Sequence, residues 1–261
     1  MNICKLRSLF LGFSLLGSQV FISQPAFAEL ADTIERVKPS IVGVGTYKNT
    51  SSPQFVLRGT GFVIGNGSLI ATNAHVVPDN ALPDDPVLVI QARNAQGEQQ
   101  IRRAQLVSRD REHDLAVLRI EGLALPALSL RNSDSIREGQ SIAFTGFPIG
   151  GALGFSPVTH RGMVSSVTPI ALPAGNAQQI NEKLIRRLKN GTFNILQLDA
   201  TAYPGNSGSP VFDPESGEVF GIINMVFVKG TKEVALSHPS GISYAIPSRY
   251  LSDLLRQASP L

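Results

Sequence analysis

The stretch TAYPGNSGSP, residues 201–210, sets Ser207 among small and turn-forming residues. Proline, glycine and asparagine favour tight turns, so we expect the serine hydroxyl to stand clear of the backbone. Gly205 lacks a Cβ and permits backbone conformations that other residues avoid. A turn over Gly205, Asn206 and Ser207 can point the backbone N–H groups of Gly205 and Ser207 at one spot, where they would stabilise a developing oxyanion.

Two earlier stretches supply the groups that a reactive serine needs. TNAHVV, residues 72–77, carries His75, and HDLAVL, residues 113–118, carries Asp114. Histidine is suited to accept the serine proton, and a carboxylate bonded to its other ring nitrogen fixes the tautomer. Each fragment alone is common in structural roles, but together they predict a catalytic triad of His75, Asp114 and Ser207.

Residues 1–28 have the pattern of a secretory signal. Lys5 and Arg7 precede an apolar run at 9–16, and the small residues at 26–28 predict cleavage after that triplet. An uncleaved membrane anchor is the alternative, but glycine and serine interrupt the run before it reaches the length a bilayer requires. We therefore expect export to the periplasm or the extracellular space, with no stable membrane span after signal cleavage.

Composition excludes several other classes of protein. Loss of Lys5 and Arg7 with the signal lowers the formal net charge from +3 to +1, which argues against a nucleic-acid partner. Cys4 is the only cysteine and also lies in the signal, so the 233 residues that remain of 261 have no disulfide. Four histidines without a short-spaced His/Glu cluster predict no metal site, and we expect no cofactor.

Most of the chain is predicted to form short β-strands. Glycine and proline punctuate apolar stretches of strand length, a spacing typical of antiparallel barrels or sandwiches. The predicted strands are Ser40–Tyr47, Phe55–Ile64, Leu69–Thr72, Val87–Ala92, Leu115–Ile120, Ser141–Phe147, Pro157–Val167, Asn194–Ala200, Val219–Val228 and Gly241–Ile246. Three helices are predicted at Leu30–Lys38, Ala177–Lys189 and Ser248–Gln257.

A loop near Glu121–Pro126 marks a boundary between two domains. The first, 29–125, holds the candidate histidine and aspartate, and the second, 126–261, holds the candidate serine and the C-terminal helix. The predicted helical insert at 178–190 is expected either to cover the cleft or to be a surface excursion.

The order of the three residues separates unrelated serine hydrolases. Ser–Asp–His is typical of α/β-hydrolases and Asp–His–Ser of subtilisin-like enzymes. The lipase-type elbow G-x-S-x-G is also absent, because Ser209 stands where its second glycine is required. His–Asp–Ser is the chymotrypsin-like order.

TNAHVV, HDLAVL and PGNSGSP resemble the chymotrypsin-like serine peptidases, and most closely the HtrA/DegP-like branch. Segments at 144–150, 161–166 and 241–247 follow in the same order as in that family, and the resemblance covers roughly residues 30–255. It implies an all-β fold of two six-stranded antiparallel β-barrels with a short C-terminal helix and the active site in the cleft between them. It also implies endopeptidase activity on polypeptides, with the Gly205 and Ser207 amides as the oxyanion hole.

The same resemblance implies where the substrate binds. The pocket for the residue before the scissile bond, P1, should be shaped by Thr201, Tyr203, Ile222, Ile223 and Asn224. The two isoleucines and the lack of a nearby acid argue against arginine or lysine at P1. We therefore expect a small or medium apolar P1 residue.

The chain departs from the HtrA-like pattern in three places. Ser209 replaces the usual glycine and brings the motif closer to glutamyl endopeptidases, but those carry a histidine near the position of Asn224. The chain ends soon after Ile246, so we expect no PDZ domain and carry over no peptide-gated activation or cage assembly. Asn206 stands where trypsin-like zymogens use an aspartate, so activation by a freed N-terminus is not expected.

These observations favour an exported serine endopeptidase that acts on unfolded or damaged proteins. One alternative keeps the chemistry but gives it glutamyl-endopeptidase-like specificity. Another is a protease-like chaperone or binding module with little turnover, against which the intact triad argues, because such a scaffold has no chemical need for all three groups.

Overall fold

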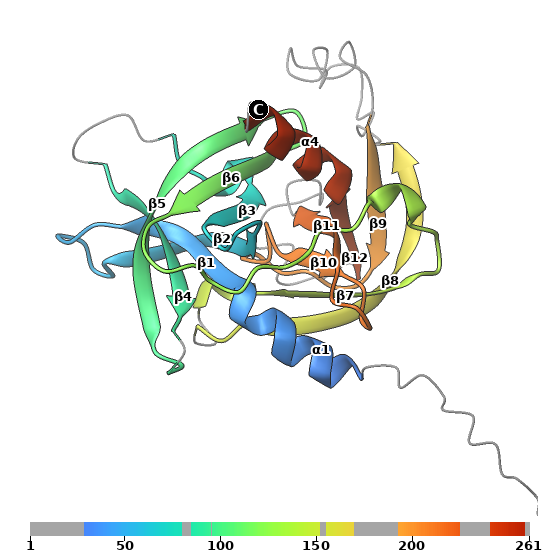
Figure 1. The fold of residues 1–261 in the computed structure, drawn as a ribbon, viewed down its shortest axis with the longest axis horizontal. Coiled ribbons are helices and arrows are strands. Elements are labelled where there is room, and N and C mark those ends of the chain that lie inside the picture. The colour runs from blue at the N-terminus through green and yellow to red at the C-terminus, as the bar shows by residue number, and fades with distance from the viewer. Residues whose placement is uncertain are drawn as a thin grey trace, which may run out of the picture.

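The computed structural model describes residues 29–79, 85–94, 96–151, 155–169, 193–224 and 241–258. They form two closed, six-stranded antiparallel barrels that lie side by side (Figure 1). This confirms the predicted double-barrel fold. The predicted signal at 1–28, the predicted helix at 177–189 and the end of the strand predicted over Val219–Val228 lie outside the described residues.

The first barrel comes from the N-terminal half of the chain. Its strands are hydrogen-bonded in the order β1-β2-β3-β6-β5-β4, with every neighbouring pair antiparallel. The strands are β1 (Ile41–Tyr47), β2 (Phe55–Ile64), β3 (Leu69–Asn73), β4 (Val87–Arg93), β5 (Gln99–Asp110) and β6 (Leu115–Ile120).

The second barrel repeats this pattern with the order β10-β11-β12-β9-β8-β7. Its strands are β7 (Ser141–Gly146), β8 (Val158–Pro169), β9 (Asn194–Asp199), β10 (Pro210–Phe212), β11 (Val219–Asn224) and β12 (Ile242–Pro247). Short 3-10 turns interrupt the described connections: η1 (Lys38–Ser40), η2 (Ala74–Val76), η3 (Ser133–Ser135) and η4 (Pro148–Gly151).

Two of these strands were not predicted from the sequence. β5 is long but mostly polar, and only Ala104 among its residues is buried. β10 has only three residues, Pro-Val-Phe, all of them buried. Neither stretch carries the alternation of apolar and polar residues on which the prediction relied.

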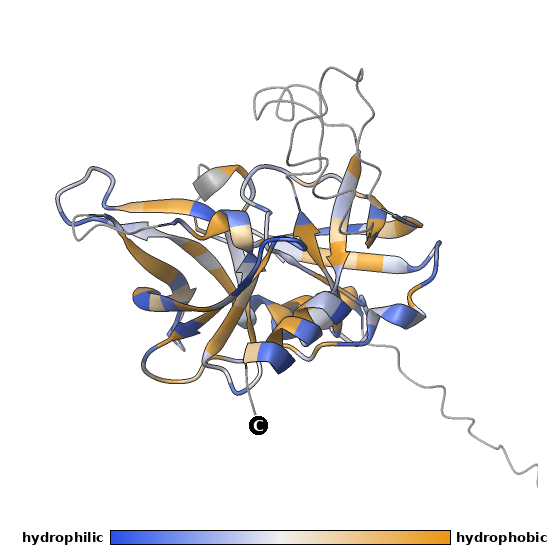
Figure 2. Ribbon diagram, turned by 90° about the horizontal axis from the view of Figure 1, so that it is seen from above, coloured by the Kyte–Doolittle hydropathy of each residue, from blue (hydrophilic) through white to orange (hydrophobic). Residues whose placement is uncertain are grey.

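Apolar side chains gather in three clusters. One fills the first barrel and includes Val44, Ile70 and Leu118, and another fills the second barrel around Phe144 and Phe220. Figure 2 shows the corresponding hydrophobic colour along the strands of both barrels, with hydrophilic colour in the connecting loops.

The third cluster joins the two barrels. It contains Phe62 and Val117 from the first barrel and Phe212 and Ile246 from the second, all fully buried. Burial of such a side chain contributes about 1.5–3 kcal/mol, so this cluster gives the barrels one shared core rather than a loose contact.

A helix at each end of the described chain packs over this shared core (Figure 1). α1 (Leu30–Val37) buries Thr33 and Val37, which are four residues apart and so lie on one face. α4 (Ser248–Ala258) buries Leu251 and Leu254 in the same cluster. Within the described residues, no helix is both long enough and apolar enough to cross a bilayer.

Strand β2 and the loop after β9 meet at a seam without space for side chains. Gly208 has φ +89, and a Cβ at that position would lie 2.0 Å from the Thr60 carbonyl oxygen. By contrast, Gly139 has φ +82, and a Cβ there would meet nothing within 4 Å. Both glycines have a left-handed backbone, but only Gly208 also lacks space for a Cβ. A comparison of the two positions therefore separates the cost of backbone strain from the cost of a steric clash.

We expect Gly208→Ala to lower the free energy of unfolding by about 2–5 kcal/mol, because a left-handed alanine costs roughly 1–2 kcal/mol and overpacking adds about 1–3 kcal/mol. The matched control Gly139→Ala should lower the free energy of unfolding only by the roughly 1–2 kcal/mol of a left-handed alanine. Urea unfolding followed by circular dichroism measures both, since the chain has no tryptophan. Equal losses in the two variants would contradict a closed seam at Gly208.

Candidate active site

His75 and Asp114 form a tight pair at the end of the first barrel. Asp114 Oδ2 lies 2.6 Å from His75 Nδ1, and its Oδ1 accepts a hydrogen bond from the His75 backbone N–H at 2.9 Å. The carboxylate therefore holds both the ring and the backbone of the histidine. With Nδ1 engaged in this way, Nε2 is the ring nitrogen left to exchange a proton with another group.

The chain places this pair by bending sharply at Asp114. Asp114 has φ +54, a left-handed conformation that aspartate tolerates better than most residues. Its carbonyl oxygen accepts hydrogen bonds from Ala74 N at 3.0 Å and from Asn73 Nδ2 at 3.1 Å. The turn before β6 is thus tied through Asp114 to the segment that carries His75.

Asn224, at the end of β11, supplies a third donor to the carboxylate. Its Nδ2 donates to Asp114 Oδ2 at 2.7 Å, and the residue is fully buried. Asn224 was expected in the substrate pocket, but its side-chain amide points at Asp114. The bond crosses from the second barrel to the first, which no local sequence pattern could reveal.

Ser207 lies in a compact loop between β9 and β10. Asn206 N donates to Tyr203 O at 2.9 Å and Ser209 N to Asn206 O at 2.9 Å, which closes two successive turns. Gly205 has φ +103, as expected for the glycine of this loop. Ser207 is only 5% exposed.

The N–H groups of this loop fall into two sets. Those of Asn206, Gly208 and Ser209 donate to backbone carbonyls within the protein. Within the described part of the chain, the N–H groups of Gly205 and Ser207 donate to no protein acceptor. Two donors, one of them on the candidate nucleophile itself, are therefore available to a bound group, as an oxyanion hole requires.

Thr60 of β2 links the serine loop to the first barrel. Its N–H donates to Ser207 O at 2.8 Å, and its hydroxyl donates to Gly205 O at 2.7 Å. The same hydroxyl accepts a hydrogen bond from Phe147 N at 3.0 Å. Thr60 thereby fixes both ends of the Gly205–Ser207 turn, a role that the sequence analysis missed because threonine within a strand carries no distinctive signal.

Strand β2 also brings the Ser207 and His75 segments together. A Cβ on Gly59 would lie 2.6 Å from Val76 Cγ2 and 2.9 Å from Ser207 O, so both segments touch this strand at one point. Among the described residues, no hydrogen bond joins the Ser207 hydroxyl to the His75 ring. Such bonds are commonly long without substrate and tighten when it binds.

The other predicted pocket residues differ in how they are exposed. Thr201 and Tyr203 are partly exposed beside the serine loop. Ile222 and Ile223 are fully buried, and their side chains belong to the shared core and to the second-barrel core. A role for these two isoleucines in the pocket stays a prediction, and their side chains pack into the cores.

A histidine that the sequence analysis did not single out lies beside Tyr203. The ring of His160 stacks on Phe144 with centroids 4.8 Å apart and lies 6.1 Å from the ring of Tyr203. Its Nε2 is buried and has no hydrogen-bond partner among the residues that the structure describes. Burial lowers the pKa of His160, so this ring is uncharged at neutral pH.

The model of the trypsin-like peptidase domain family matches residues 59–222, a span that runs from β2 to β11 and includes His75, Asp114 and Ser207. The chain belongs to the trypsin-like peptidase family. Membership agrees with the two barrels and with a candidate site built from both of them.

Relatives of this chain carry names from the HtrA and DegP group. It is 31% identical over 210 residues to the mitochondrial serine protease HTRA2 of Drosophila pseudoobscura pseudoobscura, covering 80% of this chain and 41% of that protein. It is also 31% identical over 200 residues to a probable periplasmic serine endoprotease, DegP-like, of Pseudomonas fluorescens, covering 76% of this chain and 34% of that protein. The chain thus spans well under half the length of these relatives.

Solved structures lead to the same group. The HtrA-type protease AlgW with a tripeptide has a TM-score of 0.62 and 26% sequence identity, and the match covers 88% of this chain and 63% of that chain. A serine-to-alanine variant of AlgW with a tripeptide gives a TM-score of 0.61 over the same shares.

The two buried asparagines around Asp114 allow a matched stability test. We expect Asn224→Ala to lower the free energy of unfolding at pH 7 by about 1.5–3 kcal/mol, because it removes a hydrogen bond to a carboxylate. Asn73→Ala removes a bond to a neutral carbonyl and should cost about 0.5–1.5 kcal/mol. Chemical denaturation measures both, and a larger loss for Asn73→Ala would contradict the assignment of Asn224 to the Asp114 carboxylate.

Proposed function

We propose that the chain is a serine endopeptidase in which Ser207 is the nucleophile, His75 the general base and acid, and Asp114 the group that orients the imidazole. One observation carries the proposal above all. A buried carboxylate fixes His75, and the next residue, Val76, meets β2 at Gly59, where the Ser207 carbonyl also lies. The loop of this serine presents two amide donors with no acceptor among the described residues. Membership of the trypsin-like peptidase family supports it.

The reaction begins when Nε2 of His75 takes the Ser207 hydroxyl proton and Oγ attacks the carbonyl carbon of the scissile peptide. The oxyanion that forms accepts hydrogen bonds from the N–H groups of Gly205 and Ser207. His75 then donates the proton to the leaving amine, which leaves an acyl-enzyme on Ser207. A water molecule, deprotonated by the same nitrogen, hydrolyses the ester and restores the serine.

The substrates are polypeptides, and unfolded or damaged proteins are their proposed source. The solved AlgW structures hold a tripeptide, which supports a peptide as the bound ligand. The names of the DegP-like relatives place those proteins in the periplasm. Together with the sequence of residues 1–28, this supports an exported enzyme that acts in the periplasm or outside the cell.

Substitution of the nucleophile gives the decisive test. We expect Ser207→Ala and His75→Ala each to lower kcat for casein or a quenched fluorescent peptide by a factor of about 10⁶, with no further loss when they are combined. Ser209→Ala is the matched control, because it removes a hydroxyl from the same loop that has no hydrogen-bond partner among the described residues. Its activity should stay close to that of the parent protein.

A fluorophosphonate probe should label the parent protein, with the modification mapped to Ser207. Casein turnover that survives in Ser207→Ala would remove this serine from the mechanism. A parent protein that binds unfolded chains but neither cleaves them nor reacts with the probe would instead be a chaperone-like module.

The P1 residue is proposed to be small or medium-sized and apolar. Glutamate at P1 would require a positive partner in the pocket, and His160, whose ring lies 6.1 Å from that of Tyr203, is uncharged at neutral pH. We therefore expect cleavage products of a denatured protein, sequenced after digestion at pH 7, to end mainly in alanine, valine or similar residues. A dominant glutamate at these ends would establish the glutamyl-endopeptidase alternative.

A further inference from the structure

Helix α4 reaches across to the turn that carries Asp114. The ring of His113, the residue before Asp114, stacks on the ring of Tyr250 with centroids 4.0 Å apart and planes inclined by 17°. Phe193, directly before β9, meets His113 edge-on at 4.6 Å and Tyr250 at 5.5 Å. Three rings from three parts of the chain thus enclose the turn before β6.

Asp110 holds the other side of the His113 ring. Its Oδ2 lies 2.6 Å from His113 Nδ1, and its Oδ1 accepts hydrogen bonds from His113 N at 3.0 Å and Glu112 N at 2.9 Å. Burial alone would raise the pKa of Asp110, but its hydrogen bonds with His113 bring the pKa below its ordinary value. Asp110 is therefore ionised at neutral pH, and His113 is held from two directions.

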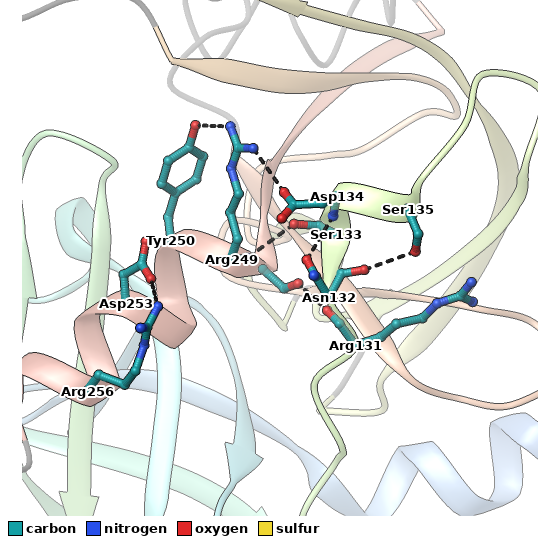
Figure 3. Close-up of polar contacts among 10 residues, drawn as sticks. Arg131, Asn132, Ser133, Asp134, Ser135, Arg249, Tyr250, Asp253 and Arg256 are labelled. Carbon is teal, nitrogen blue, oxygen red and sulfur yellow. Dashed lines mark hydrogen bonds and ion pairs between the residues drawn. The ribbon is translucent and has the colours of Figure 1, made fainter.

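Tyr250 is fixed in turn from the segment between the barrels (Figure 3). Arg249 Nη2 donates to the Tyr250 hydroxyl at 2.6 Å, and Arg249 Nη1 pairs with Asp134 Oδ1 at 3.0 Å. The hydroxyl of Ser248 donates to Arg131 O at 2.6 Å at the start of the helix. Ser248 and Arg249 thus hold the first turn of α4 in place, and this turn presents Tyr250 to His113 of the first barrel.

We infer that Tyr250, His113 and Asp110 act as positioning residues, through which α4 sets the place of the Asp114 carboxylate beside His75. Asp114 follows His113 directly and has φ +54. The direction of the Asp114 carboxylate therefore depends on where His113 is held. The inference rests on the proposed function, since it assigns residues that support the proposed base.

Three variants test this inference. Tyr250→Leu removes the ring, Tyr250→Phe keeps the ring without the hydroxyl, and Leu251→Ala truncates a fully buried neighbour on the same helix that packs into the shared core. Kinetics on one peptide substrate between pH 5 and 8 give kcat, KM and the acid limb of the rate profile, and circular dichroism checks that each variant is folded.

We expect Tyr250→Leu to lower kcat by about 10- to 100-fold with little change in KM, the scale associated with slight misplacement of a catalytic group. The acid limb should also move to lower pH, because an imidazole loses its proton more readily as a carboxylate moves away from it. Tyr250→Phe loses the hydrogen bond from Arg249 but keeps the ring that stacks on His113, so its kcat and acid limb should stay close to those of the parent. Leu251→Ala should lose stability and leave kcat and the acid limb unchanged.

Two results would overturn the inference: an acid limb in Tyr250→Leu identical to that of the parent, or equal kcat losses in Tyr250→Leu and Leu251→Ala. A readout without turnover separates it from the proposed function. The far-downfield proton resonance of the His75 Nδ1–H, identified by its loss in His75→Ala, should weaken or shift in Tyr250→Leu and persist in Tyr250→Phe. If the parent hydrolyses nothing, the proposed function fails, while this resonance still supports or overturns the positioning role.

Discussion

The carboxylate of Asp114 accepts hydrogen bonds from both barrels, and the geometry of the candidate site depends on it. It binds the ring and the backbone of His75 in its own barrel and receives the side-chain amide of Asn224 from the other. A buried carboxylate is costly unless its oxygens are hydrogen-bonded, so each of these donors is needed for the folded state as well as for the site. The barrels therefore cannot shift against each other without disturbing the proposed base.

Thr60 forms a second connection between the barrels, because its backbone N–H and its hydroxyl hold the serine loop against the first barrel. Beside it, Asn206 is fully buried, and within the described chain both of its side-chain amide atoms lack a hydrogen-bond partner. Asparagine is uncharged, so this site carries no buried charge that would need a newly formed N-terminus to neutralise it. The loop is held by backbone bonds and close packing instead.

Sequence patterns were enough to predict ten of the strands and both described helices, because turn residues and apolar stretches of strand length are local signals. These patterns left barrels and sandwiches open, and the double barrel followed from the resemblance of the three catalytic motifs to the chymotrypsin-like peptidases. The pairing of His75 with Asp114 also followed from their motifs. Asn224 and Tyr250 could not be assigned in this way, since their roles depend on contacts between the barrels. Ile222 and Ile223 show the same limit: the sequence indicated an apolar strand but not that both of its faces pack into a core.

Each terminal helix contacts the barrel from the other half of the chain. α1, which precedes the first barrel, bonds through Thr33 and Arg36 to the Glu215 carbonyl in the turn between β10 and β11 of the second. α4, which follows the last strand of the second barrel, packs on β5 and β6 of the first barrel as well as on β11 and β12 of its own. Each half of the molecule is thus contacted by a terminal helix of the other half. If the backbone were cut in the connecting segment at 121–140, we therefore expect the two fragments to stay associated as a non-covalent complex.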